Sequence, residues 1–211
     1  MPQRSIVLAT RNPGKLREIR QVLSDLPVEV TSLAVHERIP QPAETGRTFA
    51  ENARQKALYY ARATGQWCLA DDSGLEVDAL NGAPGVRSAR YAAEAVDAGA
   101  DRKTIDAANN ARLLADLDPV DDDKRTARFV CHLALADPEG VLLEACGTVE
   151  GRIARQPRGS NGFGYDPLFL LPKLGRTAAE LSPEQKNAIS HRGQAVRELA
   201  RALAGLLAHG P

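Results

Sequence analysis

Apolar positions recur along the first part of the chain with the spacing of alternating strands and helices. Residues 5–9 (SIVLA) form a short apolar run typical of a buried strand, and residues 28–30 form a second one. Between them, residues 13–23 begin with a proline and repeat apolar side chains at helical spacing. Residues 49–64 show the same spacing, and Gly65 follows as a helix-terminating glycine. The pattern predicts strand, helix, strand and helix in that order.

The rest of the chain combines a hairpin with further helices. Residues 67–70 predict a buried strand, residues 127–136 and 141–151 predict two strands joined by the turn DPEG, and residues 101–117 and 192–207 predict helices. No internal repeat or linker divides the chain. Because helices alternate with strands early and a hairpin follows, we predict an α/β fold built on a mixed sheet.

The composition of the 211-residue chain suits a globular protein of neutral charge. Hydrophobic residues make up 43% and charged residues 26%, which supplies a core and excludes intrinsic disorder. Lys and Arg total 27, as do Asp and Glu, so the formal net charge is zero. A protein that neutralises many phosphates of a long nucleic acid normally carries a basic excess. We therefore expect no nucleic acid partner, whereas a small polyanion in a local basic pocket stays compatible with the composition.

Signals for membrane insertion, export and disulfide formation are missing from the sequence. No apolar run reaches the roughly 18 to 20 residues of a membrane helix, and the first residues lack the apolar stretch of a secretory signal. The three cysteines, Cys68, Cys131 and Cys146, are odd in number and form no C-x-x-C pair. This argues against a disulfide framework and against a cysteine zinc site. We expect a reduced, cytoplasmic protein with no membrane partner.

The first candidate for chemistry lies where the first strand gives way to a helix. It comprises Thr10, Arg11, Asn12, Pro13, Gly14 and Lys15. A helix N-terminus offers unpaired N–H groups and a positive dipole end, which attract phosphate, and Lys15 adds a full charge. A Walker A loop is excluded, because Ala9 stands where its first glycine belongs and Leu16 where a magnesium-binding hydroxyl belongs. The alternative is an ordinary helix start with a surface lysine.

A second candidate is the run Asp71-Asp72-Ser73-Gly74, which directly follows the strand predicted for residues 67–70. Adjacent side chains of an extended chain point to opposite sides, so only one of the two carboxylates faces a given cleft. Carboxylate oxygens bind magnesium, and a carboxylate can also orient or deprotonate water. The alternative is a helix N-cap made by an Asp or a Ser.

The glycine-rich loop of residues 157–167 is the third candidate. Glycines let a backbone come close to a ligand, an exposed ring of Phe163 or Tyr165 can stack on a base, and Asp166 can accept a hydrogen bond. The alternative is a tight turn whose aromatic rings anchor the loop in the core. A serine nucleophile elbow is excluded, because Arg158 stands where its first glycine belongs.

Cations gather at the start of the last predicted helix. Ser190 predicts an N-cap there, which places His191 and Arg192 in the first turn, where the helix dipole disfavours positive charge. This placement indicates that the two cations, together with Lys186, meet an anion or an oxygen-rich ring. The other three histidines form no spaced cluster, so we expect none of them to be a metal ligand.

Several segments resemble one known family when they are taken in order. They are LATRNPGK (8–15), ETG (44–46), TFAENA (48–53), ADDSGL (70–75), GAPGV (82–86), SARY (88–91), GFGYDP (162–167) and SHRG (190–193). Together they resemble the inosine triphosphate pyrophosphatase family, whose members hydrolyse noncanonical purine nucleoside triphosphates. Each segment alone is weak, but the ordered set spans nearly the whole chain and is highly specific.

The resemblance implies a role for each matching residue. It implies a triphosphate-binding loop from Thr10 to Lys15, a catalytic, magnesium-binding carboxylate at Asp72 and a substrate contact at Ser73. Further nucleotide contacts are implied for Phe163, Gly164, Tyr165, Asp166, Lys186, His191 and Arg192. Glu44 is implied as a second ligand of Mg²⁺; some members carry a second acid before it, where this chain has Ala43.

The resemblance also implies the fold, the assembly and the reaction. The family fold is a long mixed β-sheet with flanking helices that forms two lobes around a central nucleotide cleft, so residues 1–211 are expected to be a single domain of two lobes. The members are typically homodimers. The expected reaction converts ITP, dITP or XTP to the nucleoside monophosphate and pyrophosphate, which removes these nucleotides from the pool.

Two other functions stay open at this point. One is a pyrophosphatase for other modified nucleoside triphosphates, such as a modified pyrimidine nucleotide, although the run Ser190-His191-Arg192 favours a purine. The other is a sensor that binds a nucleotide without turnover. Asp72 argues against a sensor, because binding alone does not need a catalytic acid after the strand.

Overall fold

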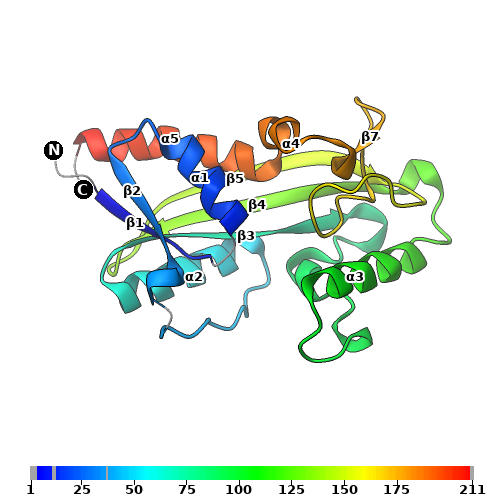
Figure 1. Ribbon diagram of the computed structural model, residues 1–211, viewed down its shortest axis with the longest axis horizontal. Coiled ribbons are helices and arrows are strands. Elements are labelled where there is room, and N and C mark those ends of the chain that lie inside the picture. Colours follow the sequence, from blue (N-terminus) through cyan, green and yellow to red (C-terminus); the bar gives the residue numbers. More distant parts are fainter. Residues whose placement is uncertain (1–3, 11–12, 37, 210–211) are drawn as a thin grey trace. The chain divides into compact units, whose positions relative to one another are not determined.

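Seven strands and five α-helices make up the part of the chain that the computed structural model describes, residues 4–10, 13–36 and 38–209 (Figure 1). The strands are β1 (Arg4–Leu8), β2 (Val28–Ser32), β3 (Trp67–Val77), β4 (Thr126–Ala136), β5 (Val141–Ile153), β6 (Phe169–Leu171) and β7 (Arg176–Thr177). The α-helices are α1 (Pro13–Leu23), α2 (Phe49–Thr64), α3 (Arg102–Asp116), α4 (Pro183–Ile189) and α5 (His191–His209). Short 3-10 helices occupy Leu33–His36, Asp78–Leu80, Gly85–Arg90, Ala93–Ala95, Asp122–Lys124 and Ala178–Glu180.

The seven strands belong to one mixed sheet, in the order β2-β1-β3-β4-β5-β6-β7. β1 runs parallel to both of its neighbours, with Ile6 opposite Val30 on β2 and opposite Trp67 on β3. β6 runs antiparallel to both β5 and β7. Parallel neighbours need a crossover connection, which α1 and α2 supply, and antiparallel neighbours need only turns. The predicted α/β fold on a mixed sheet is therefore confirmed.

The chain divides into two compact units, each made of separate segments. Unit 1 comprises residues 1–72, 131–147 and 191–211, and unit 2 comprises residues 73–130 and 148–190. The division falls within β3, β4 and β5, so each of these strands contributes residues to both units.

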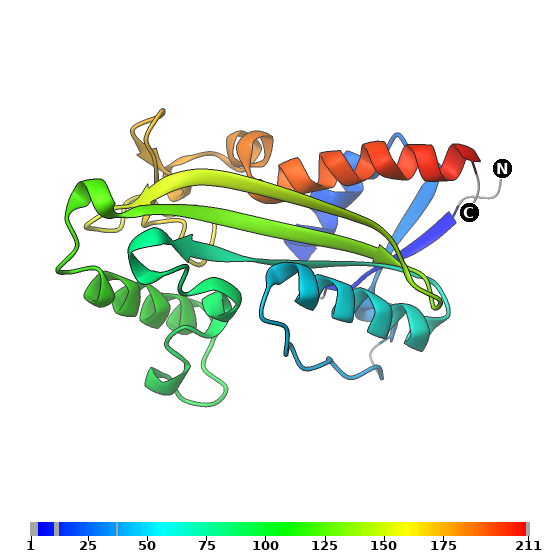
Figure 2. The ribbon, with the colours of Figure 1, turned by 180° about the vertical axis from the view of Figure 1, so that it is seen from behind.

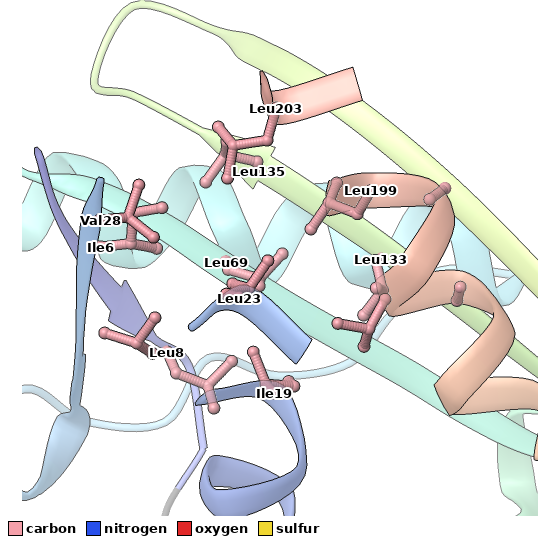
Figure 3. Close-up of a cluster of buried hydrophobic side chains, with 14 of the residues drawn as sticks. Ile6, Leu8, Ile19, Leu23, Val28, Leu69, Leu133, Leu135, Leu199 and Leu203 are labelled. Atoms are coloured by element: carbon pink, nitrogen blue, oxygen red, sulfur yellow. The ribbon is translucent and has the colours of Figure 1, made fainter. Parts of the chain in front are cut away.

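One face of the unit 1 strands packs against α1 and α5. Ile6 and Leu8 of β1, Leu69 of β3, and Leu133 and Leu135 of β4 are fully buried in this layer (Figure 3). Successive side chains of a strand point to opposite faces, so these positions recur at every second residue. Both helices add apolar side chains of their own to the layer, which fixes α1 and α5 beside each other on the sheet.

The opposite face of the unit 1 strands packs against α2 (Figure 2). Val7 and Cys68, the alternate residues of β1 and β3, are buried there against Ala53, Ala57 and Tyr60. The small side chains on both sides let the helix lie close to the sheet. Unit 1 is therefore a three-layer arrangement in which the strands are covered on both faces.

The first turn of α5 lies directly on β5. A Cβ added at Gly147 would be 2.0 Å from the carbonyl oxygen of His191 and 2.7 Å from the backbone nitrogen of Ala195. No side chain fits into that gap, because nonbonded carbon and oxygen atoms need more than 3 Å. Gly147 therefore determines how closely His191 and its neighbours approach the sheet.

Unit 2 has its own apolar core. Leu75 and Val77 of β3, Leu113 of α3, Tyr165 and Phe169 are among the residues buried in it. Because strand, helix and loop all contribute, the loop that contains Tyr165 is anchored in the core of the unit.

Some elements differ from the sequence-based expectation. The helices predicted for residues 13–23 and 49–64 are present with those limits, and Gly65 has the expected left-handed φ of 68°. The strand predicted for residues 67–70 is longer, since β3 continues to Val77. The alternative of an N-cap at residues 71–73 is therefore wrong. β6, β7 and α4 were not predicted, because segments of two to seven residues carry too little periodicity.

The three cysteines differ in their exposure to solvent. Cys68 and Cys131 are buried, Cys146 is exposed, and none of the three forms a disulfide in the described structure. No helix in the described parts of the chain is long and apolar enough to cross a membrane.

The close approach of α5 to β5 can be tested with two glycines of the same hairpin. We expect Gly147→Ala to lower the free energy of unfolding by about 2–3 kcal/mol, because its Cβ would overlap backbone atoms of α5. Gly140→Ala is the control, since a Cβ there meets nothing within 4 Å, and it should change stability by less than about 0.5 kcal/mol. Urea unfolding of both variants measures the difference, and equal effects would contradict the packing.

Candidate active site

The two aspartates in the middle of β3 face opposite sides of the unit 1 strands. Asp71 contacts Lys15 of α1 and Arg192 of α5, on the face that those helices cover. Asp72 contacts Asn52 of α2, on the other face. The sequence-based expectation that the two carboxylates point apart is confirmed, because the strand alternation of the core continues through both residues.

Asp71 is the centre of a buried ion-pair cluster. Its carboxylate lies 2.7 Å from the Nζ of Lys15 and 3.5 Å from the Nε of Arg192, and the Asp71 side chain is only 2% exposed. Burial alone would raise the pKa of Asp71, but the charges of Lys15 and Arg192 outweigh it and hold the pKa well below its ordinary value. The carboxylate is therefore ionised at neutral pH. Two cations therefore share this carboxylate.

Asp72 lies in a different electrostatic environment. Its Oδ2 accepts a hydrogen bond of 2.9 Å from the Nδ2 of Asn52. Burial raises the pKa of Asp72 to about 6, and the negative charges of Glu44 and Asp71 act in the same direction. The hydrogen bond from Asn52 and the charge of Lys56 partly offset these effects. A carboxylate with a pKa close to neutrality can accept a proton from water.

Lys56 joins Glu44 to the two aspartates. Its Nζ lies 2.8 Å from a carboxylate oxygen of Glu44 and donates to the carbonyl oxygen of Asp71 at 3.3 Å. Burial alone would lower the pKa of the ammonium, but the hydrogen bond to Glu44 and the charges of the surrounding carboxylates raise it. Lys56 therefore keeps its positive charge. Among the described contacts, the ammonium of Lys56 acts on both carboxylates, Glu44 and Asp72.

The oxygen ligands on this face suit a hard divalent cation. Glu44 lies near enough to Asp72 for its negative charge to raise the pKa of Asp72. Two neighbouring carboxylates of this kind attract cations. Among the residues that the structure describes, no group of three or more His, Cys, Asp or Glu forms a complete metal cage. Mg²⁺ is commonly held by one or two carboxylates together with phosphates of the substrate. The two carboxylates fit that mode of binding.

The predicted phosphate-binding segment is described only in part. Arg11 and Asn12 lie outside the described residues. Pro13 and Gly14 form the first turn of α1, as expected, and Lys15 follows them. The N–H of Thr10 donates to the carbonyl oxygen of Leu8 at 2.7 Å. Lys15 lies in the first turn of α1, and its ammonium group donates a hydrogen bond to Asp71 at 2.7 Å.

The glycine-rich loop of unit 2 is organised around Asp166. This residue is 2% exposed, and its Oδ2 accepts hydrogen bonds from the Nζ of Lys186 and, at 2.8 Å, from the N–H of Phe163. A Cβ at Gly162 would be 2.1 Å from the same oxygen, and Gly162 has a φ of +79°. The loop can close around the carboxylate only because residue 162 has no side chain.

The two aromatic residues of this loop have different positions. Tyr165 is 5% exposed and its hydroxyl donates to the carbonyl oxygen of Ser88 at 2.9 Å, so its ring anchors the loop in the core. Phe163 is 46% exposed, with the Nζ of Lys186 at 5.0 Å from its ring centroid. Of the two rings, that of Phe163 offers a face for stacking on a base. A ligand contact at residue 165 would come from the backbone.

Helix α3 holds the same loop from the other side. The N–H of Gly164 donates to the Oδ2 of Asp106 at 2.8 Å, and the carbonyl oxygen of Gly164 accepts from the Nδ2 of Asn110 at 3.0 Å. Asp106 and Asn110 are four residues apart and lie on one side of the helix. The exposed ring of Phe163 is therefore carried by a loop whose backbone is fixed on both sides.

Comparison with known proteins agrees with the family resemblance of the sequence segments. The sequence model of the Ham1 family matches residues 6–202. This chain belongs to the Ham1 family. It is similar to the dITP/XTP pyrophosphatases of Exiguobacterium sibiricum, with 52% identity over 96% of this chain and 98% of the relative, and of Desulforamulus reducens, with 48% identity over 97% and 98%.

Solved structures agree with this assignment to the Ham1 family. A HAM1 protein from Coxiella burnetii has a TM-score of 0.86 and 46% identity, covering 96% of this chain and 99% of that one. A nucleoside-triphosphatase, dITP/XTP pyrophosphatase, from Mycobacterium abscessus has a TM-score of 0.71 and 46% identity, covering 96% and 98%. The resemblance found in the sequence is confirmed.

The structure of this Ham1-family protein brings some of the predicted site residues together. In unit 1, Lys15 and Arg192 share Asp71, and Glu44 lies near Asp72. His191, which is 9% exposed, is in the first turn of α5 beside Arg192. In unit 2, Phe163 and Asp166 form one group with Lys186. Ser73 follows Asp72 on β3 and is the first residue of unit 2.

The sequence did not predict the residues that hold the site together in this Ham1-family protein. The sequence offers Asp71 only as one of two candidate carboxylates and gives no role to Lys56, Asn52, Asp106 and Asn110, although each contacts a predicted site residue. One usable signal was present. Asn52 and Lys56 are four residues apart on the helix predicted for residues 49–64, so they share a side of it.

The two aspartates are expected to affect stability in opposite directions. We expect Asp71→Asn to lower the free energy of unfolding by about 3 kcal/mol at pH 7, because the buried Arg192 and the partly exposed Lys15 lose their carboxylate. Since the folded pKa of Asp71 lies below its unfolded value, this contribution is present above about pH 4 and disappears as the pH falls further.

Asp72→Asn is expected to raise the free energy of unfolding by about 1–2 kcal/mol at pH 7. The folded pKa of Asp72 is raised to about 6, so its ionisation opposes folding as the pH rises from about 4 to 7. The gain should therefore vanish near pH 4. Urea unfolding of both variants between pH 4 and 7, with a chelator present, measures these differences, and a loss of stability in Asp72→Asn at pH 7 would contradict this description of the site.

Proposed function

We propose that this protein is a nucleoside triphosphate pyrophosphatase that converts noncanonical purine nucleotides (ITP, dITP and XTP) to the nucleoside monophosphate and pyrophosphate. The observation that carries the proposal is the environment of Asp72: a partly buried carboxylate with a raised pKa, next to Glu44 and Lys56. The relatives named dITP/XTP pyrophosphatase, at about half-identical sequence over nearly the whole chain, support the substrate class.

The charges in unit 1 suit a triphosphate with its counter-ion. Lys15 and Arg192 both contact Asp71, and we propose that the same two cations also contact phosphate oxygens. The Asp72 side carries two carboxylates for one lysine, so Glu44 and Asp72 keep negative charge for a divalent cation. Nucleoside triphosphate hydrolysis generally needs such a cation. We propose that it is Mg²⁺, held by Glu44 and Asp72, and that it neutralises charge on the phosphates when bound.

The proposed reaction is an attack of water on the α-phosphorus. Asp72 accepts the proton of the water as the new bond between oxygen and phosphorus forms. The bond from the α-phosphorus to the oxygen that bridges to the β-phosphorus breaks, and that oxygen leaves with pyrophosphate. Lys15 and the N-terminus of α1 stabilise the negative charge on the phosphates. Lys56, on the face of α2, offsets the like charges of Glu44 and Asp72.

We propose that unit 2 supplies most of the nucleoside contacts. The exposed ring of Phe163 stacks on the base, and Lys186, held by Asp166, supplies a hydrogen-bond donor. Hypoxanthine and xanthine carry an oxygen at position six, where adenine carries an amino group. The donor from Lys186 would be left without an acceptor by adenine, and unpaired buried donors discriminate strongly.

Other parts of the sequence-based reading stay predictions of this proposal. They are a single domain of two lobes over residues 1–211, assembly as a homodimer, and a cytoplasmic location. The contacts of Thr10, Ser73, Gly164 and Tyr165 with the nucleotide are predictions as well.

A substrate panel tests the proposed function. With Mg²⁺, we expect pyrophosphate release from ITP, dITP and XTP at least about tenfold faster than from ATP or modified pyrimidine triphosphates. Asp72→Asn should reduce turnover about a hundredfold or more while the nucleotide still binds. Binding without pyrophosphate release in the unmodified protein would identify a sensor, and faster turnover of pyrimidine nucleotides would identify the other alternative.

If Phe163 stacks on the base, removing its ring should raise KM without lowering stability. We expect Phe163→Ala to raise KM for ITP about tenfold, since stacking of an aromatic ring on a base contributes about 1–3 kcal/mol. Because the ring is 46% exposed, stability should change little. Leu174→Ala is the matched control, because Leu174 is 51% exposed in the same unit and has no place in the site. Steady-state kinetics that show equal KM values for the two variants would exclude the stacking role.

A further inference from the structure

The side chain of Asn52 is buried between the segment that contains Glu44 and the part of β3 that contains Asp72. The residue is 1% exposed, although it is polar and lies on α2. Its Oδ1 accepts a hydrogen bond of 2.8 Å from the N–H of Gly46, and its Nδ2 donates one of 2.9 Å to the Oδ2 of Asp72. An N–H can only donate and a carboxylate can only accept, so the orientation of the amide is determined by its partners.

From this arrangement we infer that Asn52 is a positioning residue that fixes the separation of Glu44 and Asp72, and thereby determines how tightly the protein binds its divalent cation. The inference rests on the proposed function in one respect, the assignment of these two carboxylates to the cation. Asn52 contacts neither the substrate nor the cation in this proposal. It acts through Asp72 at one end of its amide and through the segment of Glu44 at the other.

Gly46 makes the link between Asn52 and Glu44 short. A Cβ at this position would be 2.6 Å from the Oδ1 of Asn52 and 2.8 Å from the Cβ of Glu51, so only glycine lets the backbone come so close. Glu44 is two residues before Gly46. A hydrogen bond to the N–H of Gly46 therefore holds the backbone next to Glu44 against the middle of α2.

The same segment is also fastened to the first turn of α2. The N–H of Arg47 donates to the Oε2 of Glu51 at 2.6 Å, and the N–H of Glu51 donates to the Oγ1 of Thr48 at 3.1 Å. These contacts stabilise the start of the helix but do not reach Asp72. Of the described contacts, those of Asn52 connect the Glu44 segment directly with the Asp72 carboxylate.

The charges around the pair explain why such a link is needed. Glu44 and Asp72 repel each other, Asp71 adds a further negative charge nearby, and Lys56 is the cation that faces them from α2. Lys56 lies 2.8 Å from Glu44 and attracts Asp72 only by its charge. Mg²⁺ requires near-ideal ligand positions, so a small displacement of either carboxylate weakens binding. Partners that orient metal ligands typically change metal affinity by about 10–100-fold.

Two variants break the link from its two ends. Asn52→Leu keeps the number and branching of the side-chain heavy atoms and removes both hydrogen bonds. Gly46→Ala keeps the amide and displaces the segment that it holds. We expect each to weaken Mn²⁺ binding about 10–100-fold, measured by electron paramagnetic resonance on the protein without nucleotide. The Mg²⁺ concentration for half-maximal ITP hydrolysis should rise in parallel. The double variant should be little worse than either single one, because both changes remove the same link.

Thr48→Ala is the matched control. It removes the cap of the same helix but leaves both contacts of Asn52, so Tm should fall by a few degrees at an Mn²⁺ affinity within about twofold of the original. Unchanged Mn²⁺ affinity in Gly46→Ala and in folded Asn52→Leu would overturn the inference, as would an equal loss of affinity in Thr48→Ala. If the unmodified protein hydrolyses none of the triphosphates, the proposed function fails, whereas the Mn²⁺ measurements still decide the role of Asn52.

Discussion

The buried carboxylate of Asp71 is the constraint on which much of unit 1 depends. A carboxylate that is removed from water must be paired, and Asp71 is paired with Lys15 and Arg192, which are 56 and 121 residues away along the chain. It therefore joins the central strand β3 to the starts of α1 and α5. Both helices also pack on the apolar face of the same strands, so the ion pairs and the core specify the same arrangement.

Successive side chains of β3 point to opposite faces, so its two aspartates lie in different electrostatic environments. Asp71 points to the face of α1 and α5 and attracts cations, and Asp72 points to the face of α2 and is kept near Glu44, Asn52 and Lys56. Two neighbouring residues of the same type thus acquire opposite shifts of pKa, because one is surrounded by cations and the other is desolvated near carboxylates. In the proposed function, the first environment serves the phosphates and the second serves the divalent cation.

In unit 2, buried polar contacts hold a loop in place. Asp166 accepts hydrogen bonds inside the loop, Tyr165 anchors it in the core, and Asp106 holds its backbone from α3. Phe163 is exposed, whereas the backbone that carries it is held by these contacts. An exposed ring on a fixed backbone loses little conformational freedom on binding a flat ligand, which favours affinity.

The sequence alone determined the family, the mixed α/β fold, the helices of residues 13–23 and 49–64 and the opposite directions of Asp71 and Asp72, because periodicity, caps and motifs are local properties. It could not determine that β3 continues past Ala70, since two aspartates interrupt an apolar run. Nor could it separate the buried ring of Tyr165 from the exposed ring of Phe163, or show that Asn52, Lys56 and Asp71 support the site. Only the tertiary structure decided these points, because burial and pairing depend on which distant segments approach one another.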